Sequence, residues 1–175
     1  RIQEYSALNC AVNPQACRER DMAYQPICRP KKVLIVGGGV AGCEAARVLA
    51  IRGHEPHLFE AGSQLGGNLI PGGVPDFKED DHALAAWYAR ELERLSVPVT
   101  LNHKVTASEA MSGGYDAVIV ATGSTPKVFS LGDDARVHTA ADVLTGKADC
   151  GSKVVIVGGG LVGCETALWL AQQGK

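Results

Sequence analysis

The chain has 175 residues, of which 46% are hydrophobic and 21% are charged, and its formal net charge at pH 7 is −2. This charge gives no basic surface of the kind that binds nucleic acids or anionic membranes, so neither is an expected partner. No uninterrupted apolar stretch approaches the roughly 20 residues that cross a bilayer, which excludes a membrane-spanning class. The length suits one domain and part of a second, and with no secretory signal at the start we expect a cytoplasmic location.

Residues 1–30 are polar and irregular, with turns indicated at Asn13-Pro14 and Arg29-Pro30. We expect them to form an N-terminal tail outside the first packed domain. The tail contains three of the six cysteines: Cys10, Cys17 and Cys28. Their spacings match no zinc site, so the residues alone indicate reduced thiols.

The first packed unit opens with an apolar run that meets a glycine cluster. Val33–Val36 lacks polar alternation, as does a parallel strand that is covered on both faces. Gly37 then permits a sharp turn, Gly39 lets a pyrophosphate approach the backbone, and Gly42 lets a helix pack close to the strand. The helix is expected to run on to Arg52-Gly53 and to offer its N-terminal amides as an anion site.

A second apolar run, His57–Glu60, ends in an acid about twenty residues after the glycines, where such units place a carboxylate on a ribose hydroxyl. The glycine-rich stretch 61–75 follows at the carboxyl end of this strand, where ligands bind in parallel sheets. We therefore expect a functional loop there.

Helical spacing of apolar residues over 78–95 predicts a helix, with Asp76 or Asp80 as its cap and with Trp87 and Tyr88 as core and rim residues. A third strand is predicted over 97–101. The remaining expectations are an edge segment at His103–Val105, a fourth parallel strand at Tyr115–Val120, and the turn Ala121-Thr122-Gly123 beside the first glycines.

Residues 124–152 are expected to form a linker with one short helix at 140–144. The glycine unit then recurs 121 residues after its first copy, as a strand at 154–157, the glycines 158, 160 and 163, and a helix over 164–173. Cys43 and Cys164 occupy equivalent positions after the glycines, where we expect small inert core residues. The alternative that both units serve only as core stays open on the residues alone.

These features together resemble the two-domain flavoproteins with the glutathione-reductase-like FAD/NAD(P) fold. Cys10-Ala11-Val12-Asn13-Pro14 further resembles the C-x-V-N-P segment of the NADH:flavin oxidoreductase family that includes 2,4-dienoyl-CoA reductase, enoate reductase and trimethylamine dehydrogenase. Leu101–Ala107 is also similar to the bacterial dienoyl-CoA reductases. The resemblance implies an α/β, Rossmann-like FAD/NAD(P)-binding fold with a parallel sheet flanked by helices. It divides the chain into a tail (1–30), an incomplete FAD-binding domain (31–150) and the start of an NAD(P)-binding domain (151–175).

The resemblance implies a large enzyme in which an upstream TIM barrel carries FMN and is followed by a [4Fe–4S] cluster. Electrons would pass from NAD(P)H to FAD, through the cluster to FMN, and on to the C=C bond of an enoate or dienoyl-CoA. Cys10 matches the last cluster ligand, whereas Cys17 and Cys28 match none. Because such clusters are normally held by four cysteines, the chain by itself is not expected to assemble one, and as a fragment it is expected to be inactive alone.

The family resemblance also implies roles for individual residues. The glycine turn with the N–H of Ala41 would hold the FAD pyrophosphate, and Glu60, with Ala61 beside it, would bind the adenosine ribose. The loop at Gly66, Gly67 and Asn68 would pass over the cofactor toward its flavin. The remaining implied contacts are adenine at the Val105 backbone, the FAD pyrophosphate at Ala121, Thr122 and Gly123, and the NAD(P)H pyrophosphate at Gly158, Gly160 and Gly163.

No residue is expected to act as an acid–base catalyst, because the five histidines have no partner spacing and are expected in solvated or capping positions. Electron transfer would belong to the cofactors. Two alternatives stay open on the sequence. One is a reductase resembling the small subunit of glutamate synthase, and the other is a non-catalytic nucleotide-binding module.

Overall fold

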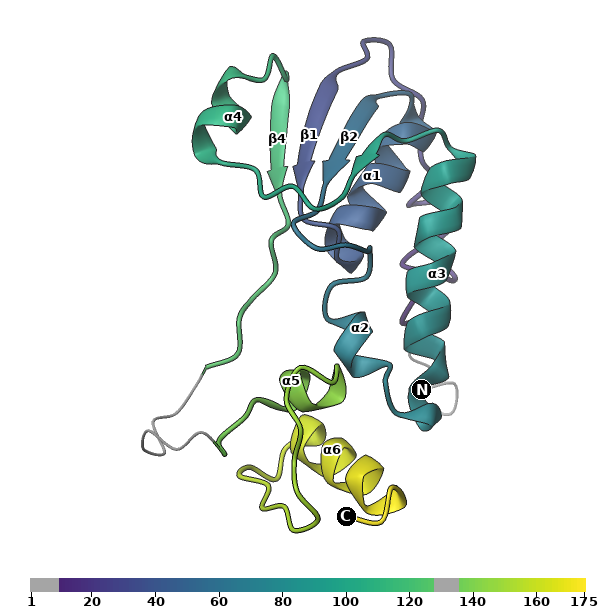
Figure 1. Cartoon of the computed structure of the whole chain (residues 1–175). Coiled ribbons are helices and arrows are strands. Elements are labelled where there is room, and N and C mark those ends of the chain that lie inside the picture. Colours follow the sequence, from purple (N-terminus) through teal and green to yellow (C-terminus); the bar gives the residue numbers. More distant parts are fainter. Residues whose placement is uncertain (1–9, 128–135) are drawn as a thin grey trace.

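The computed structural model describes residues 10–127 and 136–175, and a four-stranded parallel sheet lies at its centre (Figure 1). The strands are β1 (Lys32–Val36), β2 (Glu55–Phe59), β3 (Val99–Thr100) and β4 (Ala117–Val120). Their order is β3-β2-β1-β4, with every pair parallel. The predicted fold class is therefore confirmed. Residues 1–9 of the expected tail and 128–135 of the expected linker lie outside the described residues.

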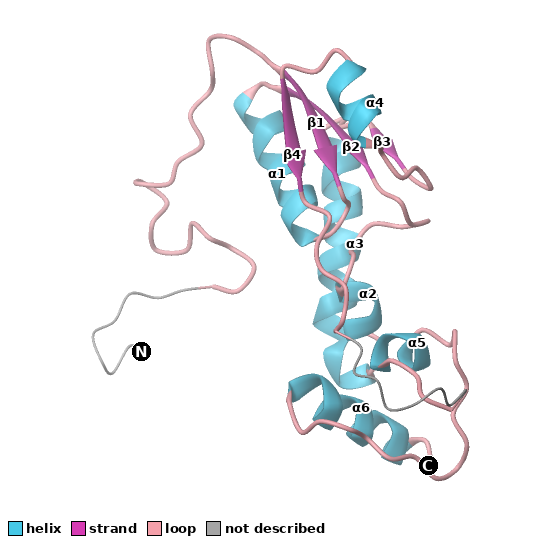
Figure 2. Ribbon diagram, turned by 90° about the vertical axis from the view of Figure 1, so that its left-hand side faces the viewer, coloured by secondary structure: helices cyan, strands magenta, loops and turns pink. Residues whose placement is uncertain are grey.

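Two long helices, α1 (Val40–Arg52) and α3 (Glu79–Arg94), cover one face of the sheet (Figures 1 and 2). The core between them is one cluster of buried side chains: Val33, Ile35, Cys43, Ala46, Leu58, Tyr88, Leu92 and Val97. Burial of this apolar area is the main stabilising contribution to the unit. Trp87 is partly exposed at the edge of this core, as predicted.

Local signals explain where α1 and α3 begin and end. α1 stops at Gly53, whose φ of 91° is left-handed and whose N–H bonds the carbonyl of Ala50. The predicted aspartate caps of α3 are wrong, because Lys78 occupies the N-cap position and no side chain caps the helix. Asp76 is used in the preceding 3₁₀ turn η2 (Asp76–Lys78), and Asp80 lies in the first turn of α3, where acids favour the helix dipole.

The opposite face of the sheet carries a row of rings. Phe59 lies 4.2 Å from His57 and 5.2 Å from His103, measured between ring centroids. His57 is not a solvated histidine as expected, because its ring nitrogens bond the Thr100 hydroxyl (2.9 Å) and the Tyr115 hydroxyl (3.2 Å). Burial lowers the pKa of His57, which favours its neutral form, so His57 acts as a packing residue.

Three short helices lie in the connections: α2 (Leu69–Gly72), α4 (Ala107–Ser112) and α5 (Ala140–Leu144). A longer helix, α6 (Leu161–Gln172), follows the second glycine turn. The predicted helix at 140–144 is confirmed. α4 was not predicted, although a capping box between Thr106 and Glu109 marks its start. α5 contacts both α2 and α6, so the C-terminal segment lies beside α2 and away from the sheet (Figure 2).

Two predicted extended segments do not form strands. His103–Val105 makes one strand-like bond, from the N–H of His103 to the carbonyl of Glu60, but Asn102 has a φ of 56° and interrupts the extension of β3. Val154–Val157 pairs with no strand among the described residues, and Val155 is 88% exposed. A strand needs a neighbour for its backbone groups, which an apolar run cannot supply by itself.

No described helix, in residues 10–127 or 136–175, has the length and apolar content needed to span a membrane.

Candidate functional site

The first glycine turn lies where β1 ends and α1 begins. Gly37 has a φ of 110°, and its N–H donates to the carbonyl of Phe59 at 2.8 Å. A Cβ at Gly37 would lie 2.3 Å from the carbonyl oxygen of Ala121, which follows β4. Both the backbone angle and the contact with the neighbouring strand end therefore require glycine at this position.

The third glycine of the turn allows helix and turn to touch. A Cβ at Gly42 would lie 1.9 Å from the carbonyl oxygen of Gly37, closer than atoms can approach. Gly39 is the N-cap of α1, and it has no side-chain cap and no acid in the first turn. The first amides of α1, including that of Ala41, therefore have no side-chain acceptor, which is the geometry from which the sequence predicts an anion site.

Glu60 follows β2 and binds the turn through its carboxylate. Oε2 accepts the N–H of Gly38 at 2.6 Å, and Oε1 accepts the N–H of Gly62 at 2.6 Å. The carboxylate thus lies at the edge of the glycine turn. Ala61, the residue that follows Glu60, is exposed. This is the position from which it could bind a ribose hydroxyl close to the helix N-terminus.

The glycine-rich loop crosses directly over the turn. Gly66 forms a bridge with Gly39, and the N–H of Gly66 donates to the carbonyl of Gly38 at 2.8 Å. Gly67 has a φ of 53°, and a Cβ there would lie 3.0 Å from the Cα of Gly39. The next residue, exposed Asn68, is the N-cap of α2. The fold therefore brings the two predicted loops together with only backbone between them.

The other predicted residues of the first unit lie nearby or at its margin. The N–H of Ala121 bonds the carbonyl of Val36 at 2.8 Å, which places Thr122 and Gly123, both exposed, at the carboxyl end of β4 next to the turn. Val105 is half-buried in the β3–α4 connection. The structure places it just before the cap of α4 and joins it to Glu60 only through the backbone bond of His103.

The second glycine turn repeats the first in its backbone. Gly158 has a φ of 112°, and a Cβ at Gly163 would lie 2.1 Å from the carbonyl oxygen of Gly158. Gly160 is the N-cap of α6 with a φ of −76° and a ψ of 179°, against −73° and −176° at Gly39. The same turn geometry is therefore present in both units, although among the described residues only the first turn lies in a sheet.

Two cysteines that are equivalent in the repeat differ in environment. Cys43 is fully buried, and burial together with the charges of Glu60 and Glu44 raises its pKa to about 12. It is the inert core residue that we expected. Cys164 is exposed, so the same expectation is wrong there, because no sheet covers α6 among the described residues.

Cys10 is exposed, and the described part of the chain contains no group of three or more His, Cys, Asp or Glu side chains that could hold a metal ion. The six described cysteines therefore do not gather into a site that fits a four-cysteine cluster.

The sequence analysis predicted no ion pairs, and two of those in the structure involve the acid that follows each glycine turn. Glu44 and Arg47 are separated by one helical turn on α1, a spacing that could have revealed them. Lys78, at the start of α3, bonds Glu165 of α6 at 3.1 Å and so joins the two glycine units. No local pattern predicts this second pair, because its partners are 87 residues apart.

Comparison with known proteins identifies the family. Residues 31–175 match the family described as pyridine nucleotide-disulphide oxidoreductase. The chain belongs to this family.

Its relatives include reductases of unsaturated compounds. Over all 175 residues the chain is 51% identical to the cinnamate reductase of Clostridium sporogenes, of which it covers 26%. It is 36% identical, over 99% of its length, to 27% of the bilirubin reductase of Mediterraneibacter gnavus. The structure of a 2-naphthoyl-CoA reductase in complex with 2-naphthoyl-CoA matches 95% of the chain with a TM-score of 0.90 at 33% identity, over 26% of that chain.

The chain thus spans about a quarter of the length of these relatives. The family membership confirms the resemblance inferred from the glycine units and from the Cys10 segment. It also confirms the Rossmann-like FAD/NAD(P)-binding fold, and it supports FAD and NAD(P)H as cofactors.

Proposed function

We propose that residues 31–150 bind FAD and that residues 151–175 open the domain that binds NAD(P)H. The observation that carries this proposal is the uncapped N-terminus of α1 under the Gly66-Gly67 loop, with the Glu60 carboxylate at its edge. A pyrophosphate fits such a cradle, because backbone amides point out of the helix N-terminus and the glycines of the turn have no Cβ to block it.

Each residue set has a defined task in this proposal. Gly37, Gly39, Gly42 and the amide of Ala41 hold the FAD pyrophosphate, and Ala121-Thr122-Gly123 closes over it. Glu60 exchanges its bond to the Gly38 amide for one to the adenosine ribose, Val105 meets the adenine with its backbone, and Asn68 lies toward the flavin. Gly158, Gly160 and Gly163 hold the pyrophosphate of NAD(P)H. FAD supplies the electron-transfer chemistry, and these residues bind and orient it.

We further propose that the chain is the electron-relay segment of a larger flavoenzyme. In it, electrons pass from NAD(P)H via FAD and a [4Fe–4S] cluster to FMN, which reduces the C=C bond of an enoate or dienoyl-CoA. The names of the cinnamate and 2-naphthoyl-CoA reductases support this substrate class. The Cys10 segment supports the cluster, whose other ligands and FMN barrel would come from residues outside this chain.

The test uses the full-length protein that carries this chain. We expect FAD, FMN and iron in the purified protein, and oxidation of NADH or NADPH that depends on an added enoate such as cinnamate. Gly39→Val, which places a branched side chain in the cradle, should abolish FAD binding, while Gly151→Val in an open position should not. A protein that carries FAD but no iron would contradict the relay, and FAD retained by Gly39→Val would contradict the cradle.

A further inference from the structure

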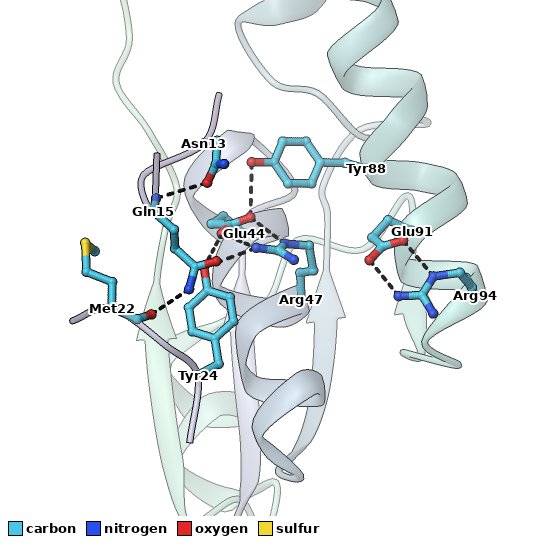
Figure 3. Close-up of polar contacts among 9 residues, drawn as sticks. All are labelled: Asn13, Gln15, Met22, Tyr24, Glu44, Arg47, Tyr88, Glu91 and Arg94. Carbon is cyan, nitrogen blue, oxygen red and sulfur yellow. Dashed lines mark hydrogen bonds and ion pairs between the residues drawn. The ribbon is translucent and has the colours of Figure 1, made fainter. Parts of the chain in front are cut away.

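A compact polar cluster joins the N-terminal segment to α1 and α3 (Figure 3). Arg47 bonds Glu44 in a two-point fork, with Nε and Nη2 each 2.8 Å from a carboxylate oxygen. Tyr24 of the N-terminal segment lies 3.2 Å from Arg47 Nη2 and 3.4 Å from Glu44, both measured from its hydroxyl oxygen. Tyr88 of α3 donates to the other oxygen of Glu44 at 3.4 Å. Three elements therefore meet at one ion pair.

Two aromatic rings lie against Arg47 and leave it only partly exposed. Its guanidinium carbon lies 5.5 Å from the centroid of Tyr24 and 5.7 Å from that of Trp87, within the range of cation–π attraction. The side chain of Arg47 is only 15% exposed. The bonds to Glu44 raise the pKa of Arg47, so it stays charged, and burial raises the pKa of Tyr88 to about 12, so it stays a donor.

The surface pair Glu91–Arg94 lies within α3 and is a matched example of the same fork without contacts from the N-terminal segment. It has the same spacing of three residues and the same two 2.8 Å bonds. Arg94, however, is 65% exposed, and Figure 3 draws no other residue against it. The burial of Arg47 is thus due to the segment and the rings that surround it, and not to the helix pair itself.

Further bonds continue the attachment along α1. The N–H of Ile27 donates to the carbonyl of Arg52 at 3.0 Å, and Arg52 Nε donates to the carbonyl of Gln25 at 3.2 Å. Upstream, the side chain of Gln15 donates to the carbonyl of Met22 at 2.6 Å and folds the segment on itself. The chain between residues 13 and 27 is therefore connected by polar bonds from the Cys10 side to the end of α1.

We propose that Arg47 is a positioning residue that docks the segment 13–27 on α1 and α3 and thereby sets where Cys10 stands relative to the FAD-binding unit. The docking follows from the contacts alone. The importance of the position of Cys10 rests on the proposed function.

The experiment compares Arg47→Met with Arg94→Met in the full-length protein. Both changes remove a guanidinium fork and keep helix propensity. Hydrogen–deuterium exchange of peptides covering residues 13–27 should become roughly tenfold faster in Arg47→Met, the factor that about 1.4 kcal/mol of lost local stability gives. Arg94→Met should leave this exchange unchanged. Equal exchange in the two variants would overturn the docking.

Tyr24→Leu provides a second route that leaves α1 intact, and it should also speed exchange over residues 13–27. A functional readout separates positioning from stability. Reduction of FAD by NAD(P)H should be unchanged in Arg47→Met, while reoxidation of the reduced FAD by the iron centre should be slower. If Arg47→Met speeds hydrogen–deuterium exchange over residues 13–27 but leaves FAD reoxidation unchanged, the proposal that Arg47 positions Cys10 is overturned.

A full-length protein without iron would overturn the proposed electron relay. The exchange experiment would then still decide whether Arg47 docks the segment.

Discussion

The two glycine turns have nearly the same sequence and nearly the same backbone, but different surroundings. Gly37 and Gly158 differ by only 2° in φ, with values of 110° and 112°. The first turn is held by Phe59, Glu60 and Ala121, which lie at the ends of β2 and β4, the two strands on either side of β1. A Cβ at Gly158 would meet nothing within 4 Å. The turn itself is thus encoded locally, whereas its embedding in a sheet is not.

The acids after each turn show the same contrast. Glu44 and Glu165 are equivalent in the repeat, and each forms an ion pair with a basic side chain. Glu44 bonds Arg47 of its own helix, while Glu165 bonds Lys78 from the other unit. The same glutamate of the motif therefore forms an ion pair within its own helix in one unit and an ion pair with the other unit in the second. The elements that pack against each helix decide which partner it has.

The largest effect is expected from substituting the first glycine of each turn. Gly37→Ala should destabilise the first unit by roughly 3 to 5 kcal/mol, because it combines a positive φ with overlap on the carbonyl of Ala121. Gly158→Ala carries the strain of φ alone and should reduce stability by about 1 to 3 kcal/mol. Urea unfolding of a Trp169→Phe background, followed by Trp87 fluorescence, measures the stability of the first unit. A Trp87→Phe background, followed by Trp169 fluorescence, measures that of the second. Equal losses at the two glycines would show that the contact with Ala121 has no energetic role.

The next effect concerns Glu60, which has no counterpart in the described second unit. Glu60→Ala removes the acceptor of the Gly38 and Gly62 amides and should reduce the unfolding free energy by about 2 kcal/mol. Glu55→Ala, at the exposed start of the same strand, is the matched control and should have little effect. Chemical denaturation of both variants measures the difference. If the control loses as much stability, the loss at Glu60 comes from the strand and not from its bonds to the turn.

The smallest effect is a difference in thiol reactivity between the two copies. Cys164 is exposed and should react with a maleimide or with a disulfide reagent in the native protein. Cys43 is buried with a pKa near 12, so it should react only on unfolding. Mass spectrometry after brief labelling, with Cys43→Ala and Cys164→Ala as references, distinguishes the two sites. Labelling of native Cys43 would show that the first unit opens readily.

Much of this molecule could be predicted from residues close together in the chain. The glycine pattern around Gly37 encodes a strand, a positive φ and a helix start, because each depends on steric limits within a few residues. Gly53 ends α1, and the acid at the end of β2 was found by its distance from the glycines. The same reasoning missed α4, although its capping box at Thr106 is a local signal and was available.

Tertiary structure alone decided the rest. The run Val154–Val157 is as apolar as Val33–Val36, yet only the latter is a strand, because β2 and β4 bond its backbone on both sides. Cys43 is inert and Cys164 is accessible for the same reason. The sequence by itself thus determined the backbone of the two glycine turns and the family of the chain. The packing of distant segments determined which turn lies in a sheet, which acid binds which cation, and how Arg47 joins the N-terminal segment to the first unit. Such contacts depend on residues that meet only after the chain has folded.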